Sequence, residues 1–309
     1  MTPTVTAPDA RIFVSVANYR DAETGPTVRD ALAQAAHPHR VVFGVLSQVV
    51  PGVDADCLAP EGSSVRQLCV HAGSSLGACW ARHRILTELR QDEPFVLQID
   101  SHTRFAPGWD ERFLCMWSGL CNPRAVLSCH PVPYTPPRQL ADPAIPLTRP
   151  KAFNEQGILA LRSHSLAWAD RPAQPPRLAF VGAGCIFAPA AAFDQVPYDP
   201  HLYFQGEEST LSARLFTHGW DVYAPNDVLL YHDYTHDRGR PKHWQDNRDW
   251  TRLNALSFAR VRYLLAGEAP ADPAALTAID RYGLGTARPL AEFEALAGVD
   301  FKARTIQAA

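Results

Sequence analysis

The sequence predicts an α/β fold in which helices cover both faces of a largely parallel sheet. Short β-rich runs alternate with amphipathic runs over about the first 120 residues, at the spacing of βαβ units. Hydrophobic residues make up 46% of the 309-residue chain and charged residues 20%, so the chain has enough apolar material for a large core. This length fits one large domain or two fused domains.

Strands are predicted where β-branched and aromatic residues cluster, and helices where apolar residues recur at helical spacing. The strands are residues 12–17, 41–48, 65–71 and 95–100, and the helices are residues 27–36, 76–90 and 109–120. The first helix is expected to open after Pro26, because the fixed φ of proline suits a helix start. Ligands bind at the carboxyl ends of parallel strands, so polar residues directly after each strand are the first site candidates.

Residues 131–179 contain ten prolines and are predicted to form a long irregular excursion with one strand at 158–162. Such a segment is either a lid or acceptor-binding region, or a surface insertion without a function. The remaining patterns predict an apolar segment at 179–189, a helix at 207–218, short strands at 221–224 and 228–232, and a long helix at 241–266. Residues 1–10 are expected to be a loose tail and residues 268–309 a small helical cap.

Composition excludes several classes of protein. The formal net charge is −3, and without a basic excess the chain is not expected to bind nucleic acid. The sequence has no apolar run of the roughly 18 residues that a membrane-spanning helix needs, and its first ten residues do not resemble a signal peptide. The seven cysteines form no CxxC pair and are expected to be buried free thiols. We therefore expect a cytoplasmic protein.

The sharpest local feature is Asp100-Ser101-His102, which ends an apolar strand. Side chains two residues apart point the same way on an extended chain, so Asp100 and His102 can face one ligand together. Carboxylate oxygen and imidazole nitrogen suit Mn²⁺ and similar ions. His232 follows another apolar run and is a candidate third ligand. The alternatives are a polar turn after a buried strand and a histidine that only makes structural hydrogen bonds.

Arg82 lies on the apolar face of its predicted helix, three and seven residues before Ile85 and Leu89. An arginine on a face that packs against a sheet needs an anionic partner. That partner is either a bound phosphate, which the start of a helix favours, or a buried carboxylate.

Glu207 and Glu208 open a predicted helix after Gly206, where acidic residues complement the helix dipole. Glu208 shares a face with Leu211 and is therefore expected to point inward. Gly182-Ala183-Gly184 resembles the start of a dinucleotide fingerprint, but position 187 is phenylalanine where the third glycine would stand. We interpret these glycines as a tight passage of the backbone.

These motifs, in their order, resemble a known family over about residues 11–267. They are FVSVANYRD, GACWARHRI, FVLQIDSHTRF, VGAGCIF, VPYDPHLYFQGEE and VLLYHDY. The chain resembles the cytosolic-type polypeptide α-N-acetylglucosaminyltransferases, which modify hydroxyproline in some eukaryotes. Its motifs are also similar to those of the polypeptide N-acetylgalactosaminyltransferases, in which an Asp-x-His closes a strand and a later histidine completes a metal site.

The resemblance implies a GT-A glycosyltransferase fold, with a Rossmann-like, mixed but mostly parallel sheet flanked by helices. It implies a catalytic domain over residues 11–267 and a helical C-terminal extension over residues 268–309. It also implies a UDP-sugar donor, Mn²⁺ or Mg²⁺ as cofactor, and retention of the anomeric configuration. The expected reaction moves a sugar, with N-acetylglucosamine from UDP-GlcNAc as the first choice, to a hydroxyl of a peptide, protein or metabolite.

The family's functional positions fall on particular residues of this chain. The metal ligands are Asp100, His102 and His232, and the donor-binding residues are Ala17, Asn18, Tyr19, Arg20, Arg82, Ser101 and Gly184. The uridine is expected beside Ala17 to Arg20. The resemblance assigns Glu207 to the reacting sugars, whereas the helical face favours Glu208, so both stay catalytic candidates.

Three matters stay open at this stage. Retention can proceed through a carboxylate nucleophile or by front-face attack. Neither the acceptor nor the oligomeric state can be inferred from the residues. Two other functions also fit an Asp/His/His set in a cleft, namely a metal-dependent hydrolase and a nucleotide-sugar-binding protein without catalysis.

Overall fold

The computed structural model describes residues 10–234 and 239–307. An eight-stranded sheet forms its centre, in the order β11-β13-β6-β12-β4-β1-β2-β3. These strands are β1 (Ile12–Tyr19), β2 (Val41–Val49), β3 (Val65–His71), β4 (Phe95–Asp100), β6 (Ala125–Ser128), β11 (Arg177–Leu178), β12 (Cys185–Pro189) and β13 (Asp221–Tyr223). Strands β4, β1, β2 and β3 run parallel, as do β6 and β13, whereas β12 runs antiparallel to β4 and β6. The predicted mixed, mostly parallel sheet is confirmed.

Helices cover both faces of this sheet, because successive strand side chains point to opposite sides. Phe13 packs with α2 (Ala78–Arg84) and α5 (Glu207–Thr217) on one face. Val14 packs with α1 (Thr24–Gln34) and α3 (Trp109–Gly119) on the other. The continuous apolar runs of β1 and β4 are those of strands buried on both faces.

A second, four-stranded sheet has the order β5-β14-β7-β8. Its strands are β5 (Thr103–Phe105), β7 (Val132–Thr135), β8 (Gln139–Leu140) and β14 (Leu230–His232). Strand β14 runs antiparallel to β5, and His232 is the register partner of Thr103. This pairing places a residue from late in the chain directly beside the end of β4.

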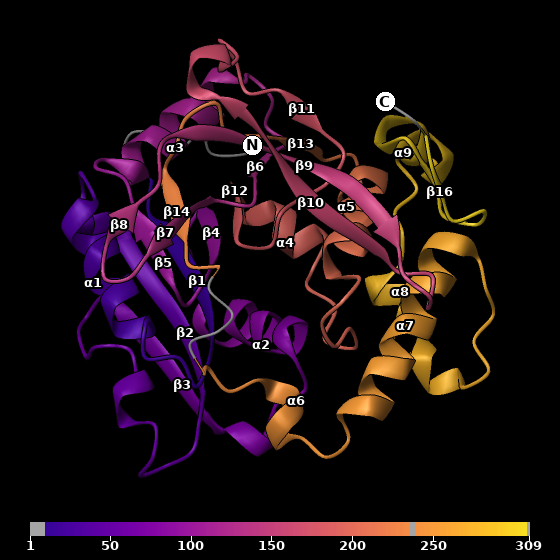
Figure 1. The fold of residues 1–309 in the computed structure, drawn as a ribbon, viewed down its shortest axis with the longest axis horizontal. Helices are drawn as coiled ribbons and strands as arrows, with labels where there is room; N and C mark the ends of the chain where they lie inside the picture. Colours follow the sequence, from indigo (N-terminus) through magenta and orange to yellow (C-terminus); the bar gives the residue numbers. More distant parts are fainter. Residues whose placement is uncertain (1–9, 235–238, 308–309) are drawn as a thin grey trace.

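Residues 131–179 are more regular than the sequence predicts. Strands β9 (Ala144–Phe153) and β10 (Leu159–Ala167) form a long antiparallel hairpin, which Figure 1 shows extending across the molecule from the side of α3 to the side of α8. The prediction of an irregular excursion was wrong because the prolines were interpreted as residues that prevent strand formation. A strand with only one partner tolerates proline, whose missing N–H can face away from that partner.

Other boundaries also differ from the predictions. Helix α1 begins before Pro26, which lies in the first turn, where an N–H has no helical partner. Helix α2 continues into a π-helical turn, Ile85–Leu89. The long helix predicted at 241–266 is two helices, α6 (His243–Asp246) and α7 (Trp250–Ala266), separated at Asn247, whose side chain donates to the Ser75 carbonyl.

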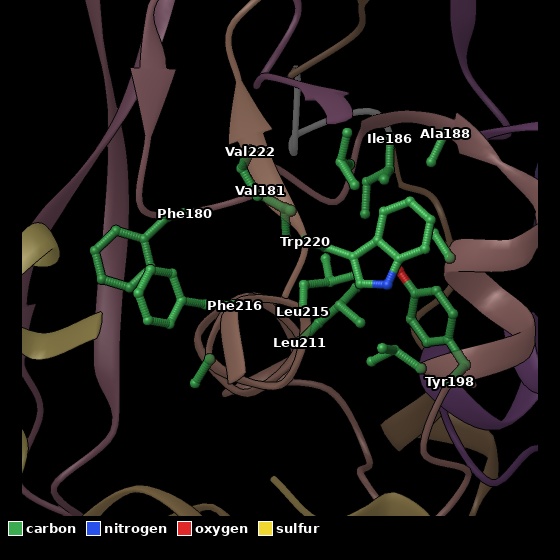
Figure 2. Close-up of a cluster of buried hydrophobic side chains, with 14 of the residues drawn as sticks. Phe180, Val181, Ile186, Ala188, Tyr198, Leu211, Leu215, Phe216, Trp220 and Val222 are labelled. Atoms are coloured by element: carbon green, nitrogen blue, oxygen red, sulfur yellow. The ribbon is translucent and has the colours of Figure 1, made fainter. Parts of the chain in front are cut away.

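Helix α5 is held from all sides. Nearly all of its residues are buried. Figure 2 shows Leu211 and Leu215 gathered with Trp220 and Tyr198 on one side of the helix, and Phe216 facing Phe180 on another. The N-cap Gly206 has φ of 89°, and a Cβ there would lie 2.5 Å from Val261 Cγ2, so only glycine fits. This packing fixes the direction in which the first residues of α5 point.

The C-terminal part contains α8 (Ile279–Tyr282), α9 (Leu290–Ala297) and the short pair β15 (Val299–Asp300) and β16 (Thr305–Ile306). Together with α4 (Ala190–Gln195), these complete the helices and strands. Of the predicted tail at residues 1–10, only Ala10 lies within the described residues, and it is buried. None of the described helices has the length and apolar character to cross a membrane.

All seven cysteines are free, as predicted, but only four are buried. Cys69, Cys115 and Cys121 are exposed.

A buried ion pair fastens α7 to the loop before α5. Arg260 Nε donates to Asp199 Oδ2 at 2.6 Å, and both side chains are fully buried. Arg260 also donates to the carbonyls of Ala275 and Thr277 at 2.9 Å. The guanidinium thus joins three segments.

We predict that Asp199→Ala lowers the free energy of unfolding by about 3–5 kcal/mol, because it leaves a buried charge without its partner. The matched control is Glu88→Ala, which breaks the surface pair with Arg84 and should cost less than about 1 kcal/mol. Urea denaturation followed by circular dichroism measures both. Equal losses in the two variants would contradict the prediction.

Candidate active site

A cavity of about 540 Å³ opens at the carboxyl end of β4. Its walls come from distant parts of the chain: the ends of β4 and β14, the start of α5, the loop before β12 and the tip of the β9–β10 hairpin. Its lining includes Arg82, Asp100, His130, Gly184, Glu207, Glu208 and His232, with Asn154 and residues 158–161 from the hairpin. The rule that ligands bind at strand ends therefore located the cavity correctly.

Asp100, His102 and His232 form one compact group. One ligand atom from each lies within 4.8 Å of the others, so all three can reach a single ion. His232 Nε2 lies 2.9 Å from Asp100 Oδ2. Although burial favours the protonated acid, the hydrogen bond with His232 and the charge of Arg82 hold the pKa of Asp100 well below its usual range. The carboxylate is therefore ionised, as a metal ligand must be.

Asp21 orients His102 from behind. Its Oδ2 lies 2.7 Å from His102 Nδ1 and also accepts a 2.8 Å hydrogen bond from the Ser101 hydroxyl. Burial disfavours the charge of Asp21, yet His102 lowers its pKa to about 2. A carboxylate on one imidazole nitrogen leaves the other free to bind a metal and fixes the ring. This donor set, two imidazoles and a carboxylate with an orienting acid behind one of them, fits a divalent transition-metal ion such as Mn²⁺.

Arg82 joins the metal-binding group to α5. Its Nη2 donates to Asp100 Oδ1 at 2.8 Å, and its Nη1 donates to Glu207 Oε1. The sequence predicted either a phosphate or a buried carboxylate as the anionic partner of Arg82, and the structure has two carboxylates there. The Nε of Arg82 is buried without a hydrogen-bond partner among the described residues. Burial raises the pKa of Glu207, although Arg82 opposes the shift.

Glu208 is the more accessible of the two glutamates. Its Oε1 accepts from the Ala183 amide at 2.7 Å and lies 2.7 Å from His130 Nε2. Although burial disfavours the charged imidazole, Glu208 raises the pKa of His130. Both glutamates line the cavity. Glu207, and not Glu208 as the helical face predicted, is the buried one.

His130 and Asp21 were not predicted as site residues from the sequence. His130 follows the four-residue strand β6, which was not predicted. The apolar run AVLS before it was a usable signal, since the rule that found His102 and His232 applies to it equally. Asp21 lies in the polar run after β1 but has no motif of its own.

The glycines before β12 allow the backbone to pass close to its neighbours. A Cβ on Gly182 would lie 2.5 Å from the Cys129 carbonyl carbon, which confirms the predicted tight passage. A Cβ on Gly184 would lie 3.5 Å from Asp100 Oδ2 and 3.6 Å from His232 Cδ2. Gly184 therefore forms a wall of the metal-binding group.

The residues assigned to uridine lie next to the cavity rather than in its lining. Ala17 is the register partner of Asp100. Asn18 is buried and donates to Ser47 Oγ at 3.0 Å. The Tyr19 hydroxyl donates to Asp246 at 2.6 Å, and Arg20 bridges Asp54 and Asp246. These contacts tie the end of β1 to α6, and the donor-binding roles of Ser101 and these four residues remain predictions.

Two solved structures share the fold. The crystal structure of GalNAc-T7 with UDP, GalNAc and Mn²⁺ matches with a TM-score of 0.60 at 10% identity, over 89% of this chain and 56% of that chain. The mannosyltransferase PcManGT from Pyrobaculum calidifontis, in complex with GDP-Man and Mn²⁺, matches with a TM-score of 0.50 at 14% identity, over 93% of this chain and 79% of that chain. This chain thus spans little more than half of GalNAc-T7. No curated protein matches it by sequence at a significant level.

The fold is that of the GT-A glycosyltransferases. The chain belongs to the Glycosyltransferase (GlcNAc) family, because the model of that family matches residues 11–63 and 58–303. Membership in this family favours sugar transfer over the metal-dependent hydrolase and the non-catalytic binding protein.

We predict that Arg82→Met destabilises the fold by about 3–5 kcal/mol, because it leaves the buried Glu207 without its cation. The double variant Arg82→Met/Glu207→Gln should recover about 1–3 kcal/mol of that loss. Urea denaturation measures the cycle, and Arg262→Met, at a partly exposed pair with Glu268, is the control. A double variant no more stable than Arg82→Met would show that the pair is not coupled.

Proposed function

We propose that this protein is a metal-dependent, retaining glycosyltransferase that moves N-acetylglucosamine from UDP-GlcNAc to a hydroxyl of a polypeptide. The observation that carries the proposal is a single cavity lined by Asp100 and His232 of the metal-binding group together with Arg82, Glu207 and Glu208. The family supports the reaction class. The UDP, GalNAc and Mn²⁺ in one structural neighbour, and the GDP-Man and Mn²⁺ in the other, support a nucleotide-sugar donor and a divalent ion.

Asp100, His102 and His232 would hold the ion, with Asp21 keeping His102 in place. When bound there, a divalent cation supplies positive charge against the diphosphate of the donor. Arg82 adds a second, fixed positive charge at the same end of the cavity. Because Asp100 and Glu207 hold the guanidinium rigidly, little reorganisation is needed when charge grows on the leaving diphosphate.

Glu207 and Glu208 take different parts in this proposal. Glu207 orients Arg82, since their side chains are paired and buried. Glu208 has an oxygen that makes no hydrogen bond to the described residues, whereas its other oxygen is fixed by Ala183 and His130. We assign Glu208 to a hydroxyl of the donor sugar or the acceptor. In the reaction by front-face attack, the bond from sugar C1 to the diphosphate oxygen breaks, the bond from C1 to the acceptor oxygen forms on the same face, and the leaving diphosphate takes the proton of the acceptor hydroxyl.

The β9–β10 hairpin forms one wall of the cavity, and we place the acceptor on that side. Asn154 and residues 158–161 line the same cavity as Asp100 and His232. Residues 11–267 would then form the catalytic unit, with the hairpin as its acceptor-binding part. Hydroxyproline, serine and threonine are the polypeptide hydroxyls to examine first.

We predict that, without acceptor, the protein releases UDP from UDP-GlcNAc faster than from UDP-GalNAc, UDP-glucose or UDP-galactose. The release should require Mn²⁺ and stop with EDTA, because the ligand group can neutralise the diphosphate only when an ion is bound. A coupled UDP assay measures this. The proposal would fail if no donor released UDP and the protein also showed no Mn²⁺-dependent UDP binding.

We predict a graded effect of the metal-binding residues on Mn²⁺ affinity. His102→Ala removes a ligand and should abolish Mn²⁺-dependent UDP binding, whereas Asp21→Asn removes only the orienting acid and should weaken Mn²⁺ binding about 10–100-fold. Titration of Mn²⁺ followed by electron paramagnetic resonance measures both. The control is Glu61→Gln, an exposed carboxylate outside the group. Wild-type affinity in His102→Ala would exclude His102 as a ligand.

A further inference from the structure

Strand β10 has a free edge. Among the residues that the structure describes it pairs only with β9, so half of its backbone N–H and C=O groups face away from any partner strand. Folded proteins usually cover or blunt such an edge, because it is a template for another strand. Most residues of β10 are exposed, and neither proline nor glycine interrupts it.

This edge begins at the cavity. Leu159, Ala160 and Leu161, the first residues of β10, line the cavity that also contains Asp100 and Glu208. The strand then runs to Ala167 along the outside of the molecule. A chain paired with β10 would therefore have one end in the cavity and the rest along the hairpin.

The prolines of β9 indicate which backbone N–H and C=O groups of β10 are free to bond with another strand. Pro150 lies opposite Leu161, and Pro146 lies opposite Ser165. Proline cannot donate, so these are expected to be the pairs that exchange no hydrogen bonds. In such pairs both residues point their backbone groups outward. Leu161, Ser163 and Ser165 therefore present N–H and C=O at the free edge.

The hairpin also carries positive charge without a partner. Arg162 lies directly opposite Arg149, an arrangement that destabilises a sheet, and Lys151 is the extra residue where the register shifts. All three are exposed and make no ion pair with the described residues. Residues 144–167 contain one acid, Glu155, against these three cations, in a chain of net charge −3. The complement of this surface is an acidic segment.

We propose that the acceptor polypeptide binds in extended form as a third strand on the free edge of β10. Its acidic residues would lie over Arg149, Lys151 and Arg162, and its hydroxyl residue would lie in the cavity near Glu208. Main-chain hydrogen bonds then supply affinity that does not depend on sequence, and the cations supply selectivity. This inference rests on the proposed function and adds the binding mode and the charge of the acceptor.

The first test uses the full chain with UDP-GlcNAc, Mn²⁺ and synthetic peptides that contain serine, threonine or hydroxyproline between acidic or basic flanks. We expect transfer to acidic peptides, and an increase in their KM of about tenfold or more in Arg149→Glu/Arg162→Glu. UDP release without acceptor should not change in this variant. Arg29→Glu, an exposed arginine on α1, is the matched control and should behave as the wild type.

The second test needs no variant of the protein. The best peptide is synthesised with a single N-methyl amide at each position in turn, and transfer should fall at every second position, because alternate amides of an added strand face its partner. Uniform tolerance, or transfer to basic peptides with equal efficiency, would overturn the proposal. The proposal would also be overturned if the protein transferred the sugar only to small hydroxyl compounds. It would be overturned as well if Arg149, Lys151 and Arg162 bound anionic vesicles and no peptide. If the wild type released no UDP from any donor, the proposed function itself would fall.

Discussion

The Arg82 guanidinium is the point on which the rest of the site depends. It is buried between two carboxylates, one at the end of β4 and one at the start of α5, and it makes a hydrogen bond to each. A buried cation in such a position requires both anions, and each anion in turn requires the cation. The distance between the metal-binding group and the helix that carries Glu207 and Glu208 is thereby fixed. The leucines on the far side of α5 prevent the helix from turning away.

The cost of burying a charge also explains why the residues of the site lie at strand ends. An ionised side chain is costly in the middle of a strand that is buried on both faces, and Asp100 lies at the end of β4, where the strand emerges. The pairing of β14 with β5 then brings His232 beside His102 without any flexible loop between them. Ligands supplied by paired strands keep their mutual distances, which is what a metal-binding group needs before an ion arrives.

Much of this arrangement could be predicted from the sequence, because the rule of polar residues after apolar strands is local. It found Asp100, His102 and His232, and the helical face correctly placed Arg82 on the inner side of its helix. The same argument chose Glu208 over Glu207 as the inward glutamate and was wrong, because Glu207 is the buried one. What could not be predicted depends on tertiary partners. That Arg82 pairs with two carboxylates rather than a phosphate requires knowing that α5 begins beside α2. The β9–β10 hairpin was missed because prolines disrupt a central strand, and nothing local reveals that β9 has one free side. His130 was missed together with the short strand before it.

The separation of the paired groups along the chain has a consequence for the newly made protein. Asp100 and His232 are 132 residues apart, and Arg82 and Glu207 are 125 apart. At a synthesis rate of about 5–20 residues per second, the ribosome needs on the order of 10 s to add the later partner after the earlier one. During that interval Arg82 and Asp100 have only each other, and α5 does not yet exist. The nascent chain thus passes through a stage in which strands β1 to β4 can pair but the site still lacks Glu207, Glu208 and His232.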